Sequence, residues 1–369
     1  MPEEAPGDRR LAVVVGKPRA QSVIDALEAE GVYDPDRSVR SWDTDSVAVP
    51  VTDPPTTVEV REVVQQVGEP RLRTLEDHLR ERGWSDDELD RAPSSWAVVG
   101  SVVLVDVGDA PRPEEVGQAL LALHGEADTV LSRGGISGAH REPDVAVLAG
   151  EGDTETVHTE HGTQYGLDLA EVMFSPGNKA ERARMGEIVN QGERVLDMFA
   201  GIGYFTLPMA RAGAQVTAVE RNPTAFRYLV ENVRRNGVDD RVRPYRADCR
   251  DVVRAGLSGA RGRGTEEREA TGGERPESPG LGEAETVDRV MMGYYEAHEY
   301  LDAALAALKP GGVVHMHEAT PEALVFDRPV ERLEAAAADA DRSMEVLETH
   351  KVKGYSEGVA HVVVDARIT

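Results

Sequence analysis

A strand that runs into a glycine turn and then a helix is the feature that most constrains how this chain folds. The segment Arg194-Val-Leu-Asp-Met-Phe-Ala-Gly-Ile-Gly-Tyr-Phe205 has this pattern, with the helix expected to begin near Phe205. Gly201 and Gly203 let the backbone approach a ligand closely, and the first turn of a helix offers free N–H groups. From Phe174 onward strands alternate with helices, which predicts a parallel sheet with crossover helices.

Acidic residues stand at the ends of three strand positions in this half. They are Asp197, Glu220 at the end of 215–220, and Asp248 within 245–249. A carboxylate after the second strand can accept both ribose hydroxyls, and Asp248 can accept an adenine amino group. Three acids suit an adenosine without phosphates, because a pyrophosphate would need a helix N-terminus free of Asp197. The pattern therefore predicts S-adenosyl-L-methionine (SAM) as co-substrate, and an NAD-type domain is the alternative.

The charge balance of the chain is strongly acidic. There are 67 Asp plus Glu against 41 Lys plus Arg, a net charge of −26, and lysine stands only at positions 17, 179, 309, 351 and 353. This pattern indicates a salt-loving host, because a Debye length of about 3 Å at 1 M salt screens the repulsion between carboxylates. Such a charge ordinarily argues against a nucleic-acid partner, but a proteome shifted the same way weakens that argument.

Cysteine and histidine usage argues against disulfides and metal centres. Cys249 is the only cysteine, which excludes an intrachain disulfide, a cysteine zinc cluster and an iron–sulfur site. The histidines at 158, 161, 315 and 317 form two close pairs in sequence, but His315 and His317 alternate on a strand without a third ligand nearby. We therefore predict no metal.

No segment of the sequence predicts a membrane association. No stretch approaches the roughly 18 to 20 apolar residues that a membrane helix needs. The start MPEEAPGDRR lacks the basic-then-apolar pattern of a signal peptide. We expect a cytoplasmic protein with no membrane partner.

Two small α/β modules are predicted before the SAM domain. The first spans residues 8–60, and the second spans residues 70–172. Elements expected in the first are a strand at 11–15, a helix at 22–28 and a strand at 46–51. Elements expected in the second are a polar helix around 71–91, strands within 96–105, a helix at 113–127, a loop at 133–138 and a strand at 145–148.

The SAM domain itself is expected at residues 173–369. Within it, residues 256–285 have almost no apolar side chains, so they are expected to form a disordered insertion. We therefore predict an α/β protein in which a class I SAM-dependent methyltransferase Rossmann-like catalytic domain follows two small α/β (α+β) modules.

Taken together, these motifs resemble the Trm5/TYW2 group of tRNA-modifying enzymes over most of the chain. The segments that carry the resemblance are 197–205, Val-Glu-Arg-Asn-Pro at 219–223, Ala-Asp-Cys at 247–249, the motif at 174–185 and the closing segment at 352–365. The resemblance implies a SAM-dependent transferase whose small modules grip the tRNA body. The implied partner is the anticodon stem-loop of tRNA(Phe), and we expect the enzyme to be a monomer.

The group has two branches, and three positions favour one of them. One branch methylates N1 of a guanine, and the other moves the 3-amino-3-carboxypropyl group of SAM to C7 of 4-demethylwyosine. Gly293 stands where the methyltransferase branch has an asparagine, Met173 replaces a tyrosine, and Asn178 ends Pro-Gly-Asn in place of Pro-Arg-Leu. The resemblance thus implies a tRNA(Phe) 4-demethylwyosine C7 aminocarboxypropyltransferase that releases methylthioadenosine. A tRNA (guanine-N1) methyltransferase and a noncatalytic tRNA-binding protein with a retained SAM fold are the alternatives.

The resemblance also implies the residues of the site. Glu181 matches the general base, and Arg141 lies where the group uses an arginine near the target base; a helix-dipole acid and a structural salt bridge are the alternatives. Gly293 is expected to leave room for the methionine arm and a large base. Aromatic side chains that could stack on that base are Tyr204, Tyr294 and Tyr295. The expected SAM-binding residues are Ser175, Asn178, Arg182, Asp197, Phe199, Gly201, Gly203, Glu220, Arg221, Asn222, Asp248, Cys249 and Gly293.

Overall fold

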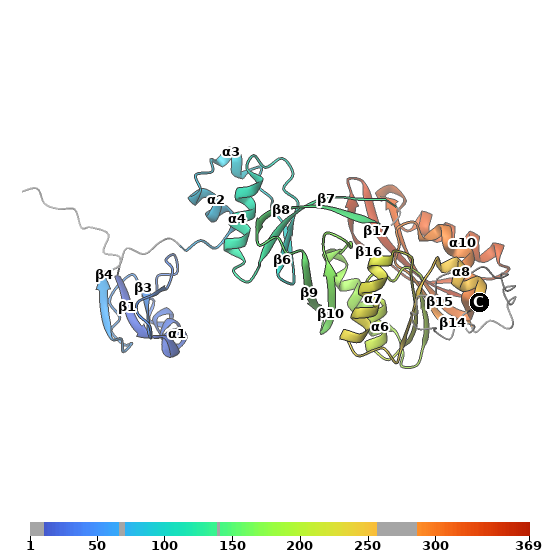
Figure 1. The fold of residues 1–369 in the computed structure, drawn as a ribbon, viewed down its shortest axis with the longest axis horizontal. Helices are drawn as coiled ribbons and strands as arrows, with labels where there is room; N and C mark the ends of the chain where they lie inside the picture. The colour runs from blue at the N-terminus through green and yellow to red at the C-terminus, as the bar shows by residue number, and fades with distance from the viewer. Residues whose placement is uncertain (1–10, 66–70, 139–140, 257–285) are drawn as a thin grey trace, which may run out of the picture. The chain divides into compact units, whose positions relative to one another are not determined.

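The structure is a computed structural model that describes residues 11–65, 71–138, 141–256 and 286–369 (Figure 1). The chain forms two compact units, Met1–Asp90 and Arg91–Thr369. The predicted insertion at 256–285 lies outside the described residues except for Gly256, which follows helix α8 (Cys249–Ala255). Within the described ranges, no helix is long and apolar enough to cross a membrane.

The first unit is built on an antiparallel four-stranded sheet in the order β2-β3-β1-β4. Its strands are β1 (Leu11–Gly16), β2 (Arg40–Ser41), β3 (Ser46–Val51) and β4 (Glu62–Gln65). Helix α1 (Ala20–Glu30) buries Val23 and Leu27 in a cluster with valines of β1 and β3. The predicted strands at 11–15 and 46–51 and the helix at 22–28 are confirmed.

The polar segment after this sheet forms two short helices instead of the single helix predicted around 71–91. Helices α2 (Leu75–Glu81) and α3 (Asp86–Leu89) each begin with a capping box, at Thr74 and Ser85. Gly83 lies between them with a φ of 79°, a left-handed conformation that ends the first helix.

The second unit opens with a four-stranded sheet in the order β5-β6-β7-β8. Its strands are β5 (Trp96–Val99), β6 (Val102–Val105), β7 (Thr129–Ser137) and β8 (Glu142–Gly150), and helix α4 (Pro113–Leu123) contacts β7 and β8. The strands predicted at 96–105 and 145–148 and the helix at 113–127 are confirmed, the helix with an earlier end. A two-stranded hairpin of β9 (Glu155–Glu160) and β10 (Thr163–Asp168) follows.

The loop predicted at 133–138 is wrong. Residues up to Ser137 continue strand β7, which pairs with β8 across a register shift between Arg133 and Ile136. Gly134 and Gly135 fall within that shift, so they mark an irregularity in a strand and do not end it.

A seven-stranded sheet in the order β13-β12-β11-β14-β15-β17-β16 forms the rest of the second unit. The parallel strands are β11 (Arg194–Asp197), β12 (Gln215–Glu220), β13 (Val242–Arg246), β14 (Val287–Met292) and β15 (Leu308–Pro321). Strand β17 (Val359–Ile368) is antiparallel to both β15 and β16 (Met344–Ser356). The predicted parallel sheet is confirmed, and an antiparallel hairpin extends one edge.

Helices cover both faces of this sheet, because alternate residues of each strand point to opposite sides. Val195 packs with one apolar cluster and Leu196 with the other. The first cluster includes residues of α5 (Lys179–Ile188), α6 (Thr206–Arg211) and α7 (Pro223–Arg235); the second includes residues of α8, α9 (Leu301–Ala307) and α10 (Asp327–Asp339). Short 3-10 turns lie at Lys17–Arg19, Pro176–Asn178, Ala297–Tyr300 and Glu322–Leu324.

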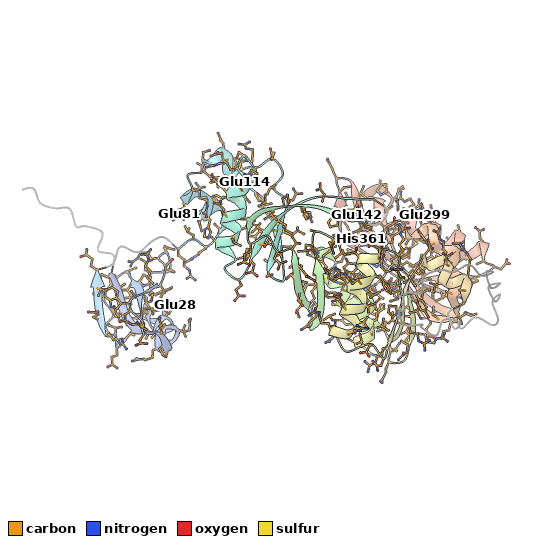
Figure 2. The ribbon with its side chains drawn as sticks, viewed as in Figure 1. Glu28, Glu81, Glu114, Glu142, Glu299 and His361 are labelled. Atoms are coloured by element: carbon orange, nitrogen blue, oxygen red, sulfur yellow. The ribbon has the colours of Figure 1, made fainter. Side chains whose placement is uncertain are left out.

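The acidic side chains are spread over exposed positions of both units. Figure 2 marks five exposed glutamates, which are Glu28, Glu81, Glu114, Glu142 and Glu299, and the fully buried His361. These five carboxylates belong to different helices, strands and turns, so exposed negative charge occurs in several elements of each unit.

Candidate functional site

The glycine turn after β11 has the backbone that only glycine adopts without strain. Gly201 has a φ of 56° and Gly203 a φ of 105°. A Cβ at Gly201 would collide with the ring of Tyr204, and a Cβ at Gly203 would lie 2.8 Å from Cγ of Leu207. Both glycines therefore allow the turn to fold tightly against the start of α6.

The buried side chain of Asp197 stabilises this turn. Its carboxylate is fully buried and accepts hydrogen bonds from Thr206 Oγ1 at 2.7 Å and from the Phe199 N–H at 3.3 Å. Burial raises the pKa of Asp197 to about 6. Asp197 and Gly203 are not among the residues that line the adjoining pocket, and their expected role in binding SAM stays a prediction.

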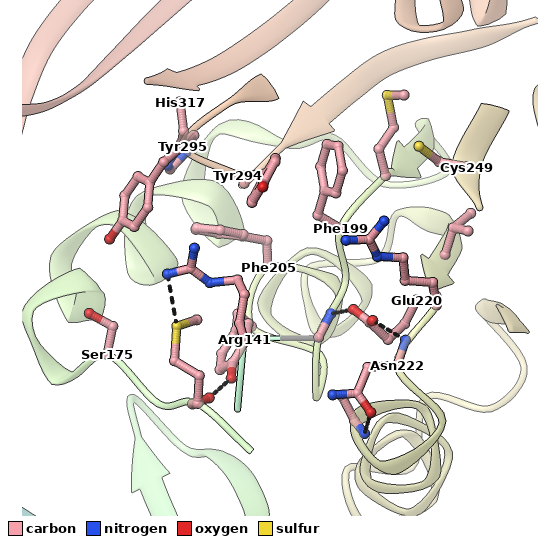
Figure 3. Close-up of a pocket in the computed structure, with 18 of the residues that line it drawn as sticks. Arg141, Ser175, Phe199, Phe205, Glu220, Asn222, Cys249, Tyr294, Tyr295 and His317 are labelled. Carbon is pink, nitrogen blue, oxygen red and sulfur yellow. Dashed lines mark hydrogen bonds between the residues drawn. The ribbon is translucent and has the colours of Figure 1, made fainter. Parts of the chain in front are cut away.

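A pocket opens beside the glycine turn, where the strands of the large sheet end (Figure 3). This is the place at which open α/β sheets bind ligands. The wall brings together twelve of the residues predicted for the site: Arg141, Ser175, Asn178, Arg182, Phe199, Gly201, Glu220, Arg221, Asn222, Asp248, Cys249 and Gly293. Other lining residues include Met173, Tyr204, Tyr294, Tyr295, His317 and His361.

Glu220 ends β12 with its carboxylate held by backbone donors. Oε2 accepts the Gly201 N–H at 2.8 Å, and Oε1 accepts the Asn222 N–H at 2.6 Å (Figure 3). Each carboxylate oxygen can accept more than one hydrogen bond, so both keep capacity for the hydroxyls of a ribose. Burial raises the pKa of Glu220, which makes partners for its charge more important.

Asp248 and Cys249 lie in the pocket wall at the start of α8. The Asp248 carboxylate caps the helix at the Arg250 N–H and also binds the Arg250 guanidinium, with Oδ2 to Nη2 at 2.7 Å. The hydrogen bonds from Arg250 lower the pKa of Asp248. Burial raises the pKa of Cys249 to about 12, so its side chain stays a neutral thiol in the wall.

Arg182 lines the pocket, but its guanidinium is already engaged. Nε and Nη2 bind the two oxygens of Glu160 at 2.7 and 2.8 Å, and Nη1 donates to the Ser175 carbonyl at 3.0 Å. Burial would raise the pKa of Glu160, but hydrogen bonds from His158 and Arg182 outweigh it and lower that pKa to about 2. Arg182 is therefore part of a buried ion pair, and its expected role at the methionine carboxylate stays a proposal.

Lys353 is a cation at this end of the pocket that sequence reasoning missed. Its Nζ contacts the Ser175 hydroxyl, which lines the pocket. Burial, together with repulsion from Arg182, Arg133 and Arg141, lowers the pKa of Lys353 to about 8. The only sequence signal was its place in the closing segment, because the contact joins residues 178 positions apart.

Arg141 lies over aromatic rings at the pocket wall, as Figure 3 shows. Its guanidinium carbon is 5.2 Å from the ring centre of Tyr295 and 6.0 Å from that of Tyr294. Nη2 also donates to the sulfur of Met173 at 3.4 Å. The Met173 carbonyl in turn accepts the hydroxyl of Tyr204. The residues predicted to meet the target base therefore form one contiguous group.

Glu181 lies outside the pocket wall, although it is the predicted general base. Its buried carboxylate binds Arg184 Nη2 at 2.7 Å and His350 Nε2 at 2.8 Å. Burial opposes ionisation, but these hydrogen bonds outweigh it and lower the pKa of Glu181. His317, which does line the pocket, has Nε2 at 3.9 Å from Glu181 Oε1.

The histidines considered for metal binding lie in different environments. His315 binds Asp365 at 2.6 Å, and His161 occupies the β9–β10 turn with a φ of 47°. His317 Nδ1 and His361 Nε2 are 2.9 Å apart. Among the described residues, no group of three or more His, Cys, Asp or Glu side chains is arranged to hold a metal ion.

Gly293 faces an aromatic ring of the pocket wall. A Cβ at this position would lie 2.7 Å from Cε2 of Phe205, which is 3% exposed. The space that a side chain at 293 would need is therefore occupied by Phe205, and a larger residue would displace that ring.

Comparison with known proteins identifies the family. Residues 156–260 and 279–347 match the TRM5/TYW2 methyltransferase domain, and residues 75–154 match the TYW2 N-terminal domain. A tRNA(Phe) (4-demethylwyosine(37)-C(7)) aminocarboxypropyltransferase of Pyrococcus horikoshii is 37% identical over 281 residues, 75% of this chain and 90% of that protein. The protein of the same name from Methanocaldococcus jannaschii is 40% identical over 235 residues, 63% of this chain and 82% of that protein.

A solved structure agrees with these matches. The crystal structure of P. horikoshii TYW2 in complex with MeSAdo has 33% identity and a TM-score of 0.62, and it covers 79% of this chain and 96% of that one. The predicted Rossmann-like class I methyltransferase fold is confirmed. The chain therefore belongs to the TRM5/TYW2 family of SAM-dependent transferases.

Proposed function

We propose that the protein moves the 3-amino-3-carboxypropyl group of SAM to C7 of 4-demethylwyosine in tRNA(Phe), in the biosynthesis of wyosine derivatives. One observation carries this proposal. Met173, Asn178 and Gly293, the positions at which the two branches of the family differ, all line one pocket with Glu220. The relatives from P. horikoshii and M. jannaschii bear the name of this activity.

The residues of the pocket fit SAM. The carboxylate of Glu220, fixed by the Gly201 and Asn222 N–H groups, would bind the ribose hydroxyls. Phe199, Asp248 and Cys249 would surround the adenine. At the other end, the side chains of Ser175 and Asn178 would bind the methionine arm, with Arg182 and Arg221 close to the site. Asp197 and Gly203 would act through the shape of the glycine turn.

Placement of the methionine arm selects the reaction. The sulfonium of SAM activates its methyl carbon, the methionine Cγ and the ribose C5′, and only the carbon aligned with the nucleophile reacts. The ring electrons of C7 form a bond to Cγ, the Cγ–S bond breaks onto sulfur to give methylthioadenosine, and C7 loses its proton. Catalysis therefore requires alignment and a proton acceptor.

The target base would occupy the side of the pocket where Arg141 lies over Tyr294 and Tyr295. Bases taken out of a nucleic acid are commonly held between aromatic or apolar side chains. The planar, positively charged guanidinium of Arg141 can stack on the tricyclic base or donate hydrogen bonds to its carbonyl oxygen. Tyr204 would help to position Met173, and through it Arg141, by its hydrogen bond to the Met173 carbonyl.

The same proposal assigns a role in tRNA binding or modification to each part of the chain. The modules at 8–60 and 70–172 would hold the tRNA body while the domain at 173–369 modifies the base in the anticodon stem-loop of tRNA(Phe). The match of residues 75–154 to the TYW2 N-terminal domain supports this role for the middle module. We further propose that the protein works in the cytoplasm as a monomer.

The nucleoside released from SAM tests this function. The full-length protein is incubated with SAM and tRNA(Phe) carrying 4-demethylwyosine, and the by-product is identified by chromatography and mass spectrometry. Methylthioadenosine is the expected product, and tRNA(Phe) with unmodified guanine serves as the matched control. Release of S-adenosylhomocysteine with the unmodified tRNA would show the methyltransferase alternative, and neither product with either tRNA would favour a noncatalytic binder.

A further inference from the structure

We infer that the hydrogen-bonded pair His317 and His361 takes up the proton that leaves C7, and that Glu181 is a positioning residue for this pair. The inference rests on the proposed function, because it concerns a step of that reaction.

Both histidines lie in the pocket wall at the hairpin of the large sheet. His317 is on β15 and His361 on the neighbouring antiparallel strand β17, and they are 1% and 0% exposed. Their shared hydrogen bond is 2.9 Å long. His317 also contacts the ring of Phe205, and His361 contacts the ring of Tyr295, which is one of the aromatics proposed for the target base. The pair therefore belongs to the base end of the pocket.

Glu181 fixes the orientation of protons within the pair. Its carboxylate is held as an anion by Arg184 and His350, and its Oε1 lies 3.9 Å from His317 Nε2. A negative charge at that distance favours an N–H at His317 Nε2 over a lone pair. His317 Nδ1 then accepts, and His361 Nε2 donates, the hydrogen bond between the rings.

This arrangement leaves the lone pair of His361 Nδ1 free. Within the part of the chain that the structure describes, neither His361 Nδ1 nor His317 Nε2 has a hydrogen-bond partner. Burial lowers the pKa of His317 to about 4 and the pKa of His361 to about 2, so both rings are neutral near pH 7. A neutral imidazole of low pKa is sufficient, because C7 still bears its proton on a positively charged ring after the new bond forms.

The electrons and the proton balance in this step. The C7–H bonding pair returns to the ring of the base, and the proton goes to His361 Nδ1. His361 Nε2–H can then pass to His317 Nδ1, which places the positive charge beside the Glu181 carboxylate. Glu181 does not line the pocket, and its own pairing with Arg184 and His350 makes it a poor direct acceptor. Its charge stabilises the imidazolium instead.

The test compares His361→Gln with the wild-type protein under single-turnover conditions. A glutamine amide can replace Nε2 in the bond to His317, but it has no basic nitrogen at the position of Nδ1. We expect the transfer rate to fall by about 10²-fold, the usual size of a general-base contribution. With a substrate deuterated at C7, a primary isotope effect should appear in the variant and not in the wild type, because proton removal becomes rate-limiting. SAM affinity, measured by equilibrium dialysis, should stay unchanged.

Two further variants keep the inference falsifiable if His361→Gln does not fold. His317→Gln and Glu181→Gln should show the same isotope effect, with Glu181→Gln the least impaired. The inference is overturned if the folded variants transfer the group without an isotope effect, or if their whole loss follows weaker SAM binding. Failure of the proposed function would show itself differently, because the wild type itself would then release no methylthioadenosine.

Discussion

Glu220 determines how firmly the adenosine end of SAM is held. Both of its oxygens accept backbone N–H groups, and the residue lines the pocket. In Glu220→Gln an amide N–H₂ would point at a backbone donor, and the charge would be lost. A hydrogen bond to a charged group contributes about 1.5–3 kcal/mol, so SAM affinity should fall by at least about tenfold. Isothermal titration calorimetry measures this change.

The control for this substitution is Glu231→Gln. Glu231 is an exposed residue of α7 that does not line the pocket. The Glu231→Gln variant should bind SAM with the affinity of the wild type. Equal affinity in both variants would contradict the role assigned to Glu220.

Gly293 is expected to be intolerant of any side chain. In Gly293→Ala the new Cβ would be 2.7 Å from the Phe205 ring, and overpacking of this kind costs about 1–3 kcal/mol. We expect a lower thermal midpoint and slower carboxypropyl transfer, with a larger loss in Gly293→Asn. Phe205→Leu should partly rescue Gly293→Ala, because the two changes act on one contact.

A matched glycine is available for comparison. A Cβ at Gly125 would meet nothing within 4 Å, so Gly125→Ala should leave both stability and transfer unchanged. If Gly293→Asn transferred the carboxypropyl group at the wild-type rate, the steric role of Gly293 would be wrong.

Among the elements of the second unit, α7, β10 and the glycine turn are joined by one buried side chain. Asn232 is fully buried, accepts the Gly166 N–H at 2.7 Å, and donates to the carbonyls of Gly166 at 2.9 Å and Ile202 at 3.0 Å. Asn232→Leu would leave a buried N–H and two carbonyls unpaired. We expect a loss of about 1–3 kcal/mol in the free energy of unfolding, measured with urea. The exposed Asn190 provides the control, since Asn190→Ala should change stability little. A wild-type midpoint for Asn232→Leu would contradict the account.

Sequence reasoning found the parts of the site that lie within one segment. The glycine turn and the acid ending β12 are local patterns, and the structure has both of them. The prediction of one helix around 71–91 was wrong because Gly83 ends a helix there. The prediction of a loop at 133–138 was wrong because its glycine pair lies inside a strand. The presence of a glycine in the sequence does not indicate whether it ends a helix or lies within a strand.

Residues brought together by strand pairing could not be predicted in this way. His317 and His361 are 44 positions apart, and Lys353 and Ser175 are 178 apart. These residues come into contact because β17 and β16 extend the edge of the parallel sheet as antiparallel strands. The hydrogen bonds of Asp197 to Thr206 and Phe199 were also not predicted, because a strand-end acid can face either a ligand or its own turn.

At the scale of the whole molecule, the net charge of −26 makes stability depend on salt. Exposed carboxylates repel each other, and added salt screens this repulsion. The thermal midpoint should rise as KCl increases from about 0.1 M to 1 M, over which the Debye length falls from about 10 Å to 3 Å. A variant with Glu28, Glu81, Glu114, Glu142 and Glu299 changed to glutamine should show a weaker rise. A midpoint independent of KCl would contradict the interpretation of the composition.

The fate of two labels in SAM tests the central claim most directly. The full-length protein is given SAM labelled with ¹⁴C at the methionine carboxyl and ³H at the methyl group, together with tRNA(Phe) carrying 4-demethylwyosine. We predict that ¹⁴C enters the tRNA while ³H stays with released methylthioadenosine. Entry of ³H into the tRNA, with ¹⁴C left in S-adenosylhomocysteine, would contradict the claim that this pocket presents the methionine Cγ to the base.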